Sequence, residues 1–91
     1  MILDQLDTLD EMLIKIAQRF KRIRKIKKYT QEELSLKSNV SYGSIKRFEN
    51  TGEISLYSLA RLCDALDMRD EISNMFKNTH YNDIKEVLND K

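Results

Sequence analysis

The hydrophobic residues of the chain recur at intervals of three and four, which is the period of one face of an α-helix. In the first part of the sequence these positions are Leu9, Leu13, Ile16, Phe20 and Ile23. Thr8 precedes this run, and Glu11 follows Thr8 by the three residues typical of a capping box at a helix start. The pattern therefore predicts a first helix that begins after Thr8 and turns this apolar face inward.

Further caps and breaks divide the remaining sequence into shorter helices. Thr30 with Glu33 repeats the capping box and predicts a helix over about 31–38. Serine caps then predict helices over about 42–50 and 56–66, the former ended by Gly52 in the left-handed conformation. Asp70 is expected to cap a fifth helix and Asn82 a last one. The apolar residues expected on these elements are Leu34, Val40, Ile45, Phe48, Leu59, Leu62, Cys63 and Leu66 in the core, Ile72, Met75 and Phe76 on the fifth helix, and Ile84, Val87 and Leu88 on the last.

The elements predict an all-α fold of five to six helices, because no stretch alternates as a strand would and the chain has no proline. Residues 8–78 are expected to form one domain. Residues 1–7 are read as an N-terminal extension and residues 79–91 as a C-terminal helical tail. Ile2 and Leu6 continue the spacing of the first helix backward, as an extra turn or as a separate short element.

Charge is distributed unevenly, although the net charge is only +1. Residues 1–14 carry four acids and no bases, residues 15–47 carry eleven Lys and Arg against two Glu, and residues 48–91 carry five bases against nine acids. The basic centre favours a polyanion as partner, and the alternative is a solvated helix face.

Several classes of protein are not expected. Cys63 and His80 are the only cysteine and histidine, which excludes an intrachain disulfide and leaves too few ligands for a zinc site. Cys63 is expected to be a core thiol. No apolar run is long enough to span a bilayer, and the first residues do not resemble a secretory signal, so a cytoplasmic protein is expected. Without a nucleophile–base pair, a phosphate-binding glycine loop or a metal cluster, we expect no enzyme and no cofactor.

The second and third predicted helices, joined by a tight turn, match the arrangement of a helix-turn-helix. Apolar residues must fix the angle between the two helices so that the second projects as a rigid rod. The amino end of that rod carries Ser41, Tyr42, Gly43 and Ser44, followed by Lys46 and Arg47. Thr30 and Gln31 begin the preceding helix, where free N–H groups and the helix dipole favour a phosphate.

Residues 13–68 resemble the lambda-repressor-like helix-turn-helix family, also called the Cro/C1 or XRE family. Two segments carry the resemblance at fixed spacing, Thr-Gln-Glu-Glu-Leu at 30–34 and Val-Ser-x-x-x-Ile at 40–45, and Phe48-Glu49-Asn50-x-Gly52 extends it. The resemblance implies a DNA-binding protein whose third helix enters the major groove.

The resemblance also assigns roles to individual residues. Gln31 matches a residue that binds phosphate and supports a base-reading side chain, and Tyr42, Gly43 and Arg47 match base-reading positions. Arg24 and Glu49 match a structural ion pair that holds the recognition helix. Gly43 departs from relatives that place a side chain there, so either the backbone approaches the groove closely or fewer bases are read. Guanine is the expected target of Arg47, since a guanidinium matches its O6/N7 edge.

One such helix reads only a few base pairs, so we expect a homodimer on a palindromic operator acting as a repressor. The expected dimer residues are Ile72, Met75, Phe76, Tyr81, Ile84 and Leu88. The run from Arg47 to Leu56 resembles the DNA-binding antitoxin of HipA-type kinase toxin modules, which implies a HipA-type toxin as a further partner. A phage-type or general small repressor is the alternative, and a helical protein-interaction adaptor without DNA binding is the alternative from another class.

Overall fold

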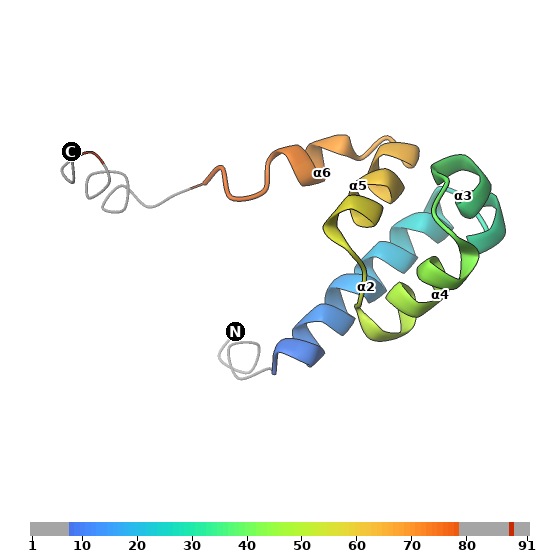
Figure 1. Ribbon diagram of the computed structural model, residues 1–91, viewed down its shortest axis with the longest axis horizontal. Coiled ribbons are helices and arrows are strands. Elements are labelled where there is room, and N and C mark those ends of the chain that lie inside the picture. Colours follow the sequence, from blue (N-terminus) through green and yellow to red (C-terminus); the bar gives the residue numbers. More distant parts are fainter. Residues whose placement is uncertain (1–7, 79–87, 89–91) are drawn as a thin grey trace.

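The computed structural model describes residues 8–78 and residue 88. The described residues form five α-helices, which are α2 (Leu9–Ile26), α3 (Gln31–Ser38), α4 (Tyr42–Thr51), α5 (Leu56–Ala65) and α6 (Arg69–Ser73). The long helix α2 lies beside α4, and α5 packs on α3 (Figure 1). The all-helical prediction is confirmed for this part of the chain.

The helix starts follow from the side chains that cap them. Thr8 and Thr30 each form a complete capping box with the glutamate three residues later. Ser41 and Ser55 accept hydrogen bonds from the backbone N–H groups of Ser44 and Ser58. At the end of α4, Gly52 adopts φ +82°, as predicted. The bounds of α3, α4 and α5 therefore agree with the sequence prediction within one residue.

The core is built from side chains of α2, α3, α4 and α5. Leu34, Ile45 and Leu62 are fully buried, and the rings of Phe20 and Phe48 meet edge to face with centroids 5.3 Å apart. Val40, in the turn between α3 and α4, is also buried. The apolar contacts predicted to fix α3 against α4 are thus present.

The predicted inner face of α2 is wrong over its first half. Leu9, Leu13 and Ile16 are exposed, Ile23 is partly buried, and Ala17 joins Phe20 in the core. The physical reason is that Leu9 lies at the exposed amino end of α2, while Ile16 lines an open groove between α2, α5 and α6. The apolar stripe is therefore longer than the surface that buries it.

The prediction for the fifth helix needs two corrections. Asp70 does not cap it, because α6 starts at Arg69 after Met68 and has no side-chain cap. Met75 and Phe76 lie beyond its end at Ser73, and Phe76 adopts φ +63°, which ends any helical continuation. The predicted last helix falls outside the described residues except for Leu88, which is helical and exposed.

Candidate nucleic-acid interface

Helix α4 has two faces of different character. Ile45, Phe48 and Glu49 point into the molecule and are buried. All the residues predicted to contact DNA on this helix are exposed, namely Ser41, Tyr42, Gly43, Ser44, Lys46 and Arg47. The helix therefore presents a polar outer surface over its whole length while its apolar face anchors it.

The turn that leads into α4 is held by short polar contacts. Asn39 adopts the left-handed conformation with φ +61°. The hydroxyl of Ser38 accepts a hydrogen bond from the N–H of Val40 at 3.1 Å, and the hydroxyl of Ser35 donates to the carbonyl of Val40 at 2.6 Å. With its polar groups satisfied and Val40 buried, this turn fixes the direction in which α4 leaves.

A buried ion pair holds the inner face of α4 to α2. The guanidinium of Arg24 donates two hydrogen bonds to Glu49, from Nε to Oε2 at 2.7 Å and from Nη2 to Oε1 at 2.9 Å. Both residues are 5% exposed. The third donor, Nη1, reaches the carbonyl of Tyr29 at 2.7 Å and so ties the loop before α3 to the same pair. The geometry is bidentate, which is the specific arrangement of arginine with carboxylate.

Gln31 joins this network, which sequence reasoning did not foresee. Its Nε2 donates to Oε1 of Glu49 at 2.9 Å, so that the amino end of α3 is linked directly to α4. Glu49 thus accepts from residues of α2 and α3 together. A residue expected from the resemblance to bind phosphate also positions the helix that carries the outer surface.

The outer surface of α4 contains its own contacts. Nζ of Lys46 lies 5.8 Å from the centroid of the Tyr42 ring, a cation–π arrangement one helical turn apart. The hydroxyl of Ser41, besides capping the helix, donates to the hydroxyl of Ser44 at 2.8 Å. These contacts orient side chains near the amino end without burying them.

Arg47 is held by a partner that the sequence did not indicate. Its Nε donates to Oε1 of Glu53 at 2.9 Å, and its Nη2 contacts the same oxygen. Glu53 lies beyond the end of α4, and its N–H donates to the hydroxyl of Thr51. Both side chains of the pair are largely exposed. Exposed ion pairs are weak, so Arg47 can leave Glu53 at small cost.

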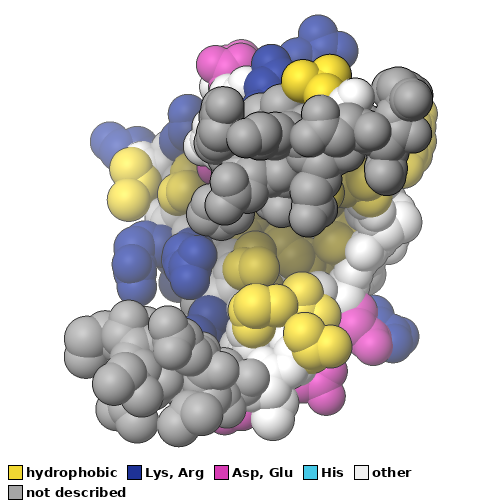
Figure 2. All heavy atoms as spheres, turned by 90° about the vertical axis from the view of Figure 1, so that its left-hand side faces the viewer, with side chains coloured by type: hydrophobic (Ala, Val, Ile, Leu, Met, Phe, Trp, Pro, Cys, Tyr) yellow, Lys and Arg dark blue, Asp and Glu magenta, His cyan; other side chains and the backbone are white. Residues whose placement is uncertain are grey.

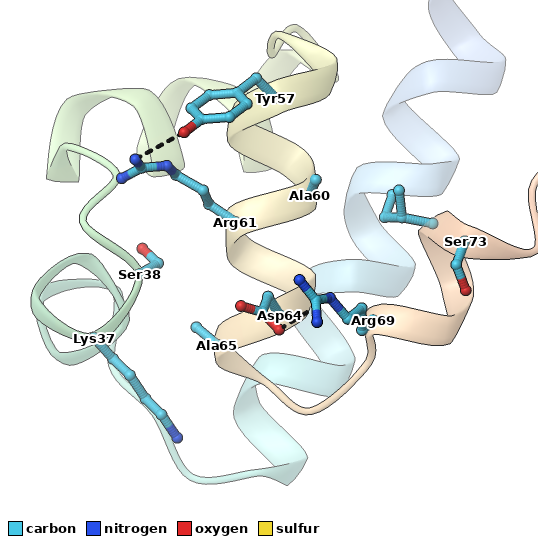
Figure 3. Close-up of a pocket in the computed structure, with 10 residues that line it drawn as sticks. Lys37, Ser38, Tyr57, Ala60, Arg61, Asp64, Ala65, Arg69 and Ser73 are labelled. Carbon is cyan, nitrogen blue, oxygen red and sulfur yellow. Dashed lines mark hydrogen bonds and ion pairs between the residues drawn. The ribbon is translucent and has the colours of Figure 1, made fainter.

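A hollow lined by basic residues lies away from α4, between α3, α5 and α6 (Figure 3). It measures about 530 Å³. Arg61 there donates to the hydroxyl of Tyr57 at 2.9 Å, and Arg69 pairs with Asp64 at 3.6 Å. Lys37 donates to the hydroxyl of Tyr29, a hydrogen bond that raises the pKa of the lysine. No lining residue belongs to α4, so this hollow is separate from the candidate interface.

Other chemistry is sparse in the described part of the chain. Cys63 is a buried free thiol, as expected, and burial raises its pKa. No group of three or more His, Cys, Asp and Glu among the described residues is placed to hold a metal ion. The helices in the described ranges are too short or too polar for any of them to cross a membrane.

Taken together, the tight turn, the anchored α4 and its exposed polar surface define a helix-turn-helix DNA-binding domain. A family model described as helix-turn-helix matches residues 20–71, more than half of the chain. The chain therefore belongs to the Cro/C1-type (XRE) helix-turn-helix family of DNA-binding transcription regulators. No curated protein and no solved structure matches it.

Proposed function

We propose that this regulator is a sequence-specific cytoplasmic repressor that binds a palindromic operator as a homodimer, with neither cofactor nor enzymatic activity. The observation that carries the proposal is the outer surface of α4, which is polar, exposed and fixed from behind by Arg24 and Glu49. A rigid rod of this kind can enter the major groove without rearranging the core. Two copies would read half-sites roughly 34 Å apart.

Within this surface we assign base reading to Tyr42, Gly43 and Arg47. Ser41, Ser44 and Lys46 lie beside them as phosphate contacts, and Thr30 with Gln31 supplies the amino end of α3. Gln31 therefore acts in two ways, toward DNA and toward Glu49.

Arg47→Ala is expected to weaken binding to the operator by about 1–3 kcal/mol, or roughly 5- to 150-fold in Kd. Arginine pairs with guanine through two hydrogen bonds, so the loss should be confined to sequences with guanine at one position. Selection of bound sites from random DNA, followed by titration of the selected site and of variants at that base, measures this. An equal loss on every sequence would show that Arg47 contacts phosphate only.

Glu53→Gln is expected to have the opposite effect and to tighten binding about two- to fivefold at low salt. The substitution frees Arg47 from its exposed ion pair and removes a negative charge beside the DNA surface. Titration of the same operator at two salt concentrations tests it, with Asp70→Asn, on α6, as the control for loss of an exposed charge. Weaker binding by Glu53→Gln would mean that the pair orients Arg47 for DNA.

Gly43→Ala separates the two explanations for glycine at this position. No heavy atom lies within 4 Å of a Cβ placed there, so packing within the protein does not require glycine. Alanine should raise the free energy of unfolding by about 0.5–1 kcal/mol. We infer that glycine is required at position 43 because the backbone there approaches DNA closely. We therefore expect Gly43→Ala to bind the operator more weakly, although it is the more stable protein. Unchanged affinity would favour a protein that reads fewer bases.

The antitoxin role toward a HipA-type kinase remains a prediction that rests only on the resemblance of residues 47–56. A phage-type or general small repressor would use the same surface of α4. A helical protein-interaction adaptor would not use this surface for DNA. A chain that binds a protein partner but no DNA would therefore support the adaptor instead of the present proposal. The division into residues 1–7, 8–78 and 79–91 also stays a prediction.

A further inference from the structure

An apolar groove lies between α2, α5 and α6, and Phe48 of α4 also lines it. Its volume is about 260 Å³. Hydrophobic side chains from all three elements line it, among them Ile16, Ile23, Leu59, Met68, Ile72 and Met75. Figure 2 shows hydrophobic side chains gathered in a hollow at the centre of the view, with lysine and arginine side chains along one edge.

The apolar surface continues beyond the groove along α2. Leu9 is 74% exposed, and Met12 and Leu13 are also open to solvent on the stripe that ends at Ile16 in the groove. Soluble monomers rarely expose a continuous apolar surface of this kind unless something covers it. The groove and the stripe together are therefore a candidate docking surface.

The chain itself leaves the fold from the rim of this groove. Met75 lines the groove and lies two residues beyond the end of α6. The next residue, Phe76, is 88% exposed. Figure 1 shows that the described chain beyond α6 leads away from α2 and α5. The described chain after Met75, up to residue 78, therefore runs away from the groove.

The sequence of that segment suits a groove of this shape. Tyr81, Ile84 and Leu88 are spaced by three and four residues, so a helix would place them on one face. Leu88 is helical. Asp83 and Glu86 fall off that face, so a helix docked through Tyr81, Ile84 and Leu88 would keep both carboxylates out of the apolar groove. The groove itself is lined by one residue of each charge, Arg19 and Glu71. A helix over residues 81–88 would be about 12 Å long and could insert its apolar side chains as helix-in-groove partners do.

We propose that residues 81–88 of a second copy of this chain bind in the groove, and that two copies exchange these segments reciprocally. This inference rests on the proposed homodimer and specifies its interface. Ile72 and Met75 form part of the groove of one protomer, while Tyr81, Ile84 and Leu88 enter it from the other. Reciprocal exchange fills both grooves and gives the self-complementary contact that twofold symmetry requires.

Disulfide trapping between two differently tagged full-length chains tests the exchange. Both chains carry Cys63→Ala, which removes the only native thiol. One chain also carries Ile16→Cys in the groove, and the other carries Ile84→Cys. Mild oxidation of the mixture should give a product that contains both tags on a non-reducing gel. Leu36→Cys, on an exposed position of α3 that does not line the groove, replaces Ile16→Cys in the control and should give none.

Packing of the segment into its own groove would leave the mixed single variants unlinked, while a chain carrying both Ile16→Cys and Ile84→Cys would close an internal disulfide. That result would overturn the exchange. Failure to form either product would overturn occupancy of the groove by this segment.

Ile84→Asp separates the exchange from the proposed function. The variant should sediment as a monomer at micromolar concentration and bind a single half-site as wild type does, but should lose the tighter binding to the full palindrome. A dimeric Ile84→Asp would overturn the exchange and leave the homodimer standing. A wild-type chain that is monomeric at micromolar concentration and on its selected operator would overturn the homodimer itself.

Discussion

Glu49→Ala is expected to lower the free energy of unfolding by about 3–5 kcal/mol, because it leaves the guanidinium of Arg24 buried without its counter-charge. Arg24 is almost fully enclosed and directs two of its donors at this one carboxylate. Small domains have a total stability of only about 5–15 kcal/mol, so the loss is a large part of it. Urea unfolding followed by circular dichroism measures the change.

Two comparisons distinguish this mechanism from general damage. Glu53→Ala breaks the exposed ion pair with Arg47 and should cost less than about 1 kcal/mol, since solvent screens that pair. Replacing both partners, Arg24→Met with Glu49→Leu, removes the uncompensated charge and should recover part of the stability lost in Glu49→Ala. The carbonyl of Tyr29 loses its donor in the double variant, so full recovery is not expected. A double variant less stable than the single one would contradict the argument.

The network around Glu49 also connects stability to DNA reading. Three elements meet at its carboxylate, because Arg24 belongs to α2, Gln31 to α3 and Glu49 itself to α4. The surface opposite to Glu49 on α4 is the one assigned to DNA. Loss of the network should therefore loosen the orientation of α4 before the whole domain unfolds.

The local signals in the sequence predicted the helix-turn-helix well. The capping boxes at Thr8 and Thr30 are complete within four residues of sequence, so their geometry does not depend on distant contacts. Gly52 and the buried residues of α4 follow from the same local logic. The ion pair of Arg24 with Glu49 was expected from the family resemblance, and spacing along the chain alone would not have revealed it.

The failures arise where tertiary context decides. Helical spacing identifies the stripe from Leu9 to Ile16 as apolar, but not whether another element covers it. The pairing of Arg47 with Glu53 crosses a helix end, where no periodic rule applies. Met75 and Phe76 continue the apolar spacing of the fifth helix, but the helix itself ends at Ser73. In each case the side chains have the expected chemistry, while their surroundings depend on packing that local patterns do not contain.

Gly52→Ala is expected to destabilise the domain by about 2–5 kcal/mol, for two reasons that add. At φ +82° an alanine side chain is strained by about 1–2 kcal/mol. A Cβ would also lie 2.7 Å from the backbone carbon of Leu13, and crowding of a packed site costs about 1–3 kcal/mol. Relief would require α2 and the end of α4 to separate.

Gly43→Ala is the matched control, since it makes the same chemical change at the other end of α4, where no heavy atom lies within 4 Å of the added Cβ. Thermal and urea unfolding of both variants should give shifts of opposite sign, with Gly52→Ala less stable than wild type and Gly43→Ala more stable. Because α4 carries the surface assigned to DNA, Gly52→Ala should also weaken operator binding at temperatures where it remains folded. If Gly52→Ala unfolded like wild type, the close approach of α2 to the end of α4 would be wrong, and with it the packing that fixes the direction of the reading helix.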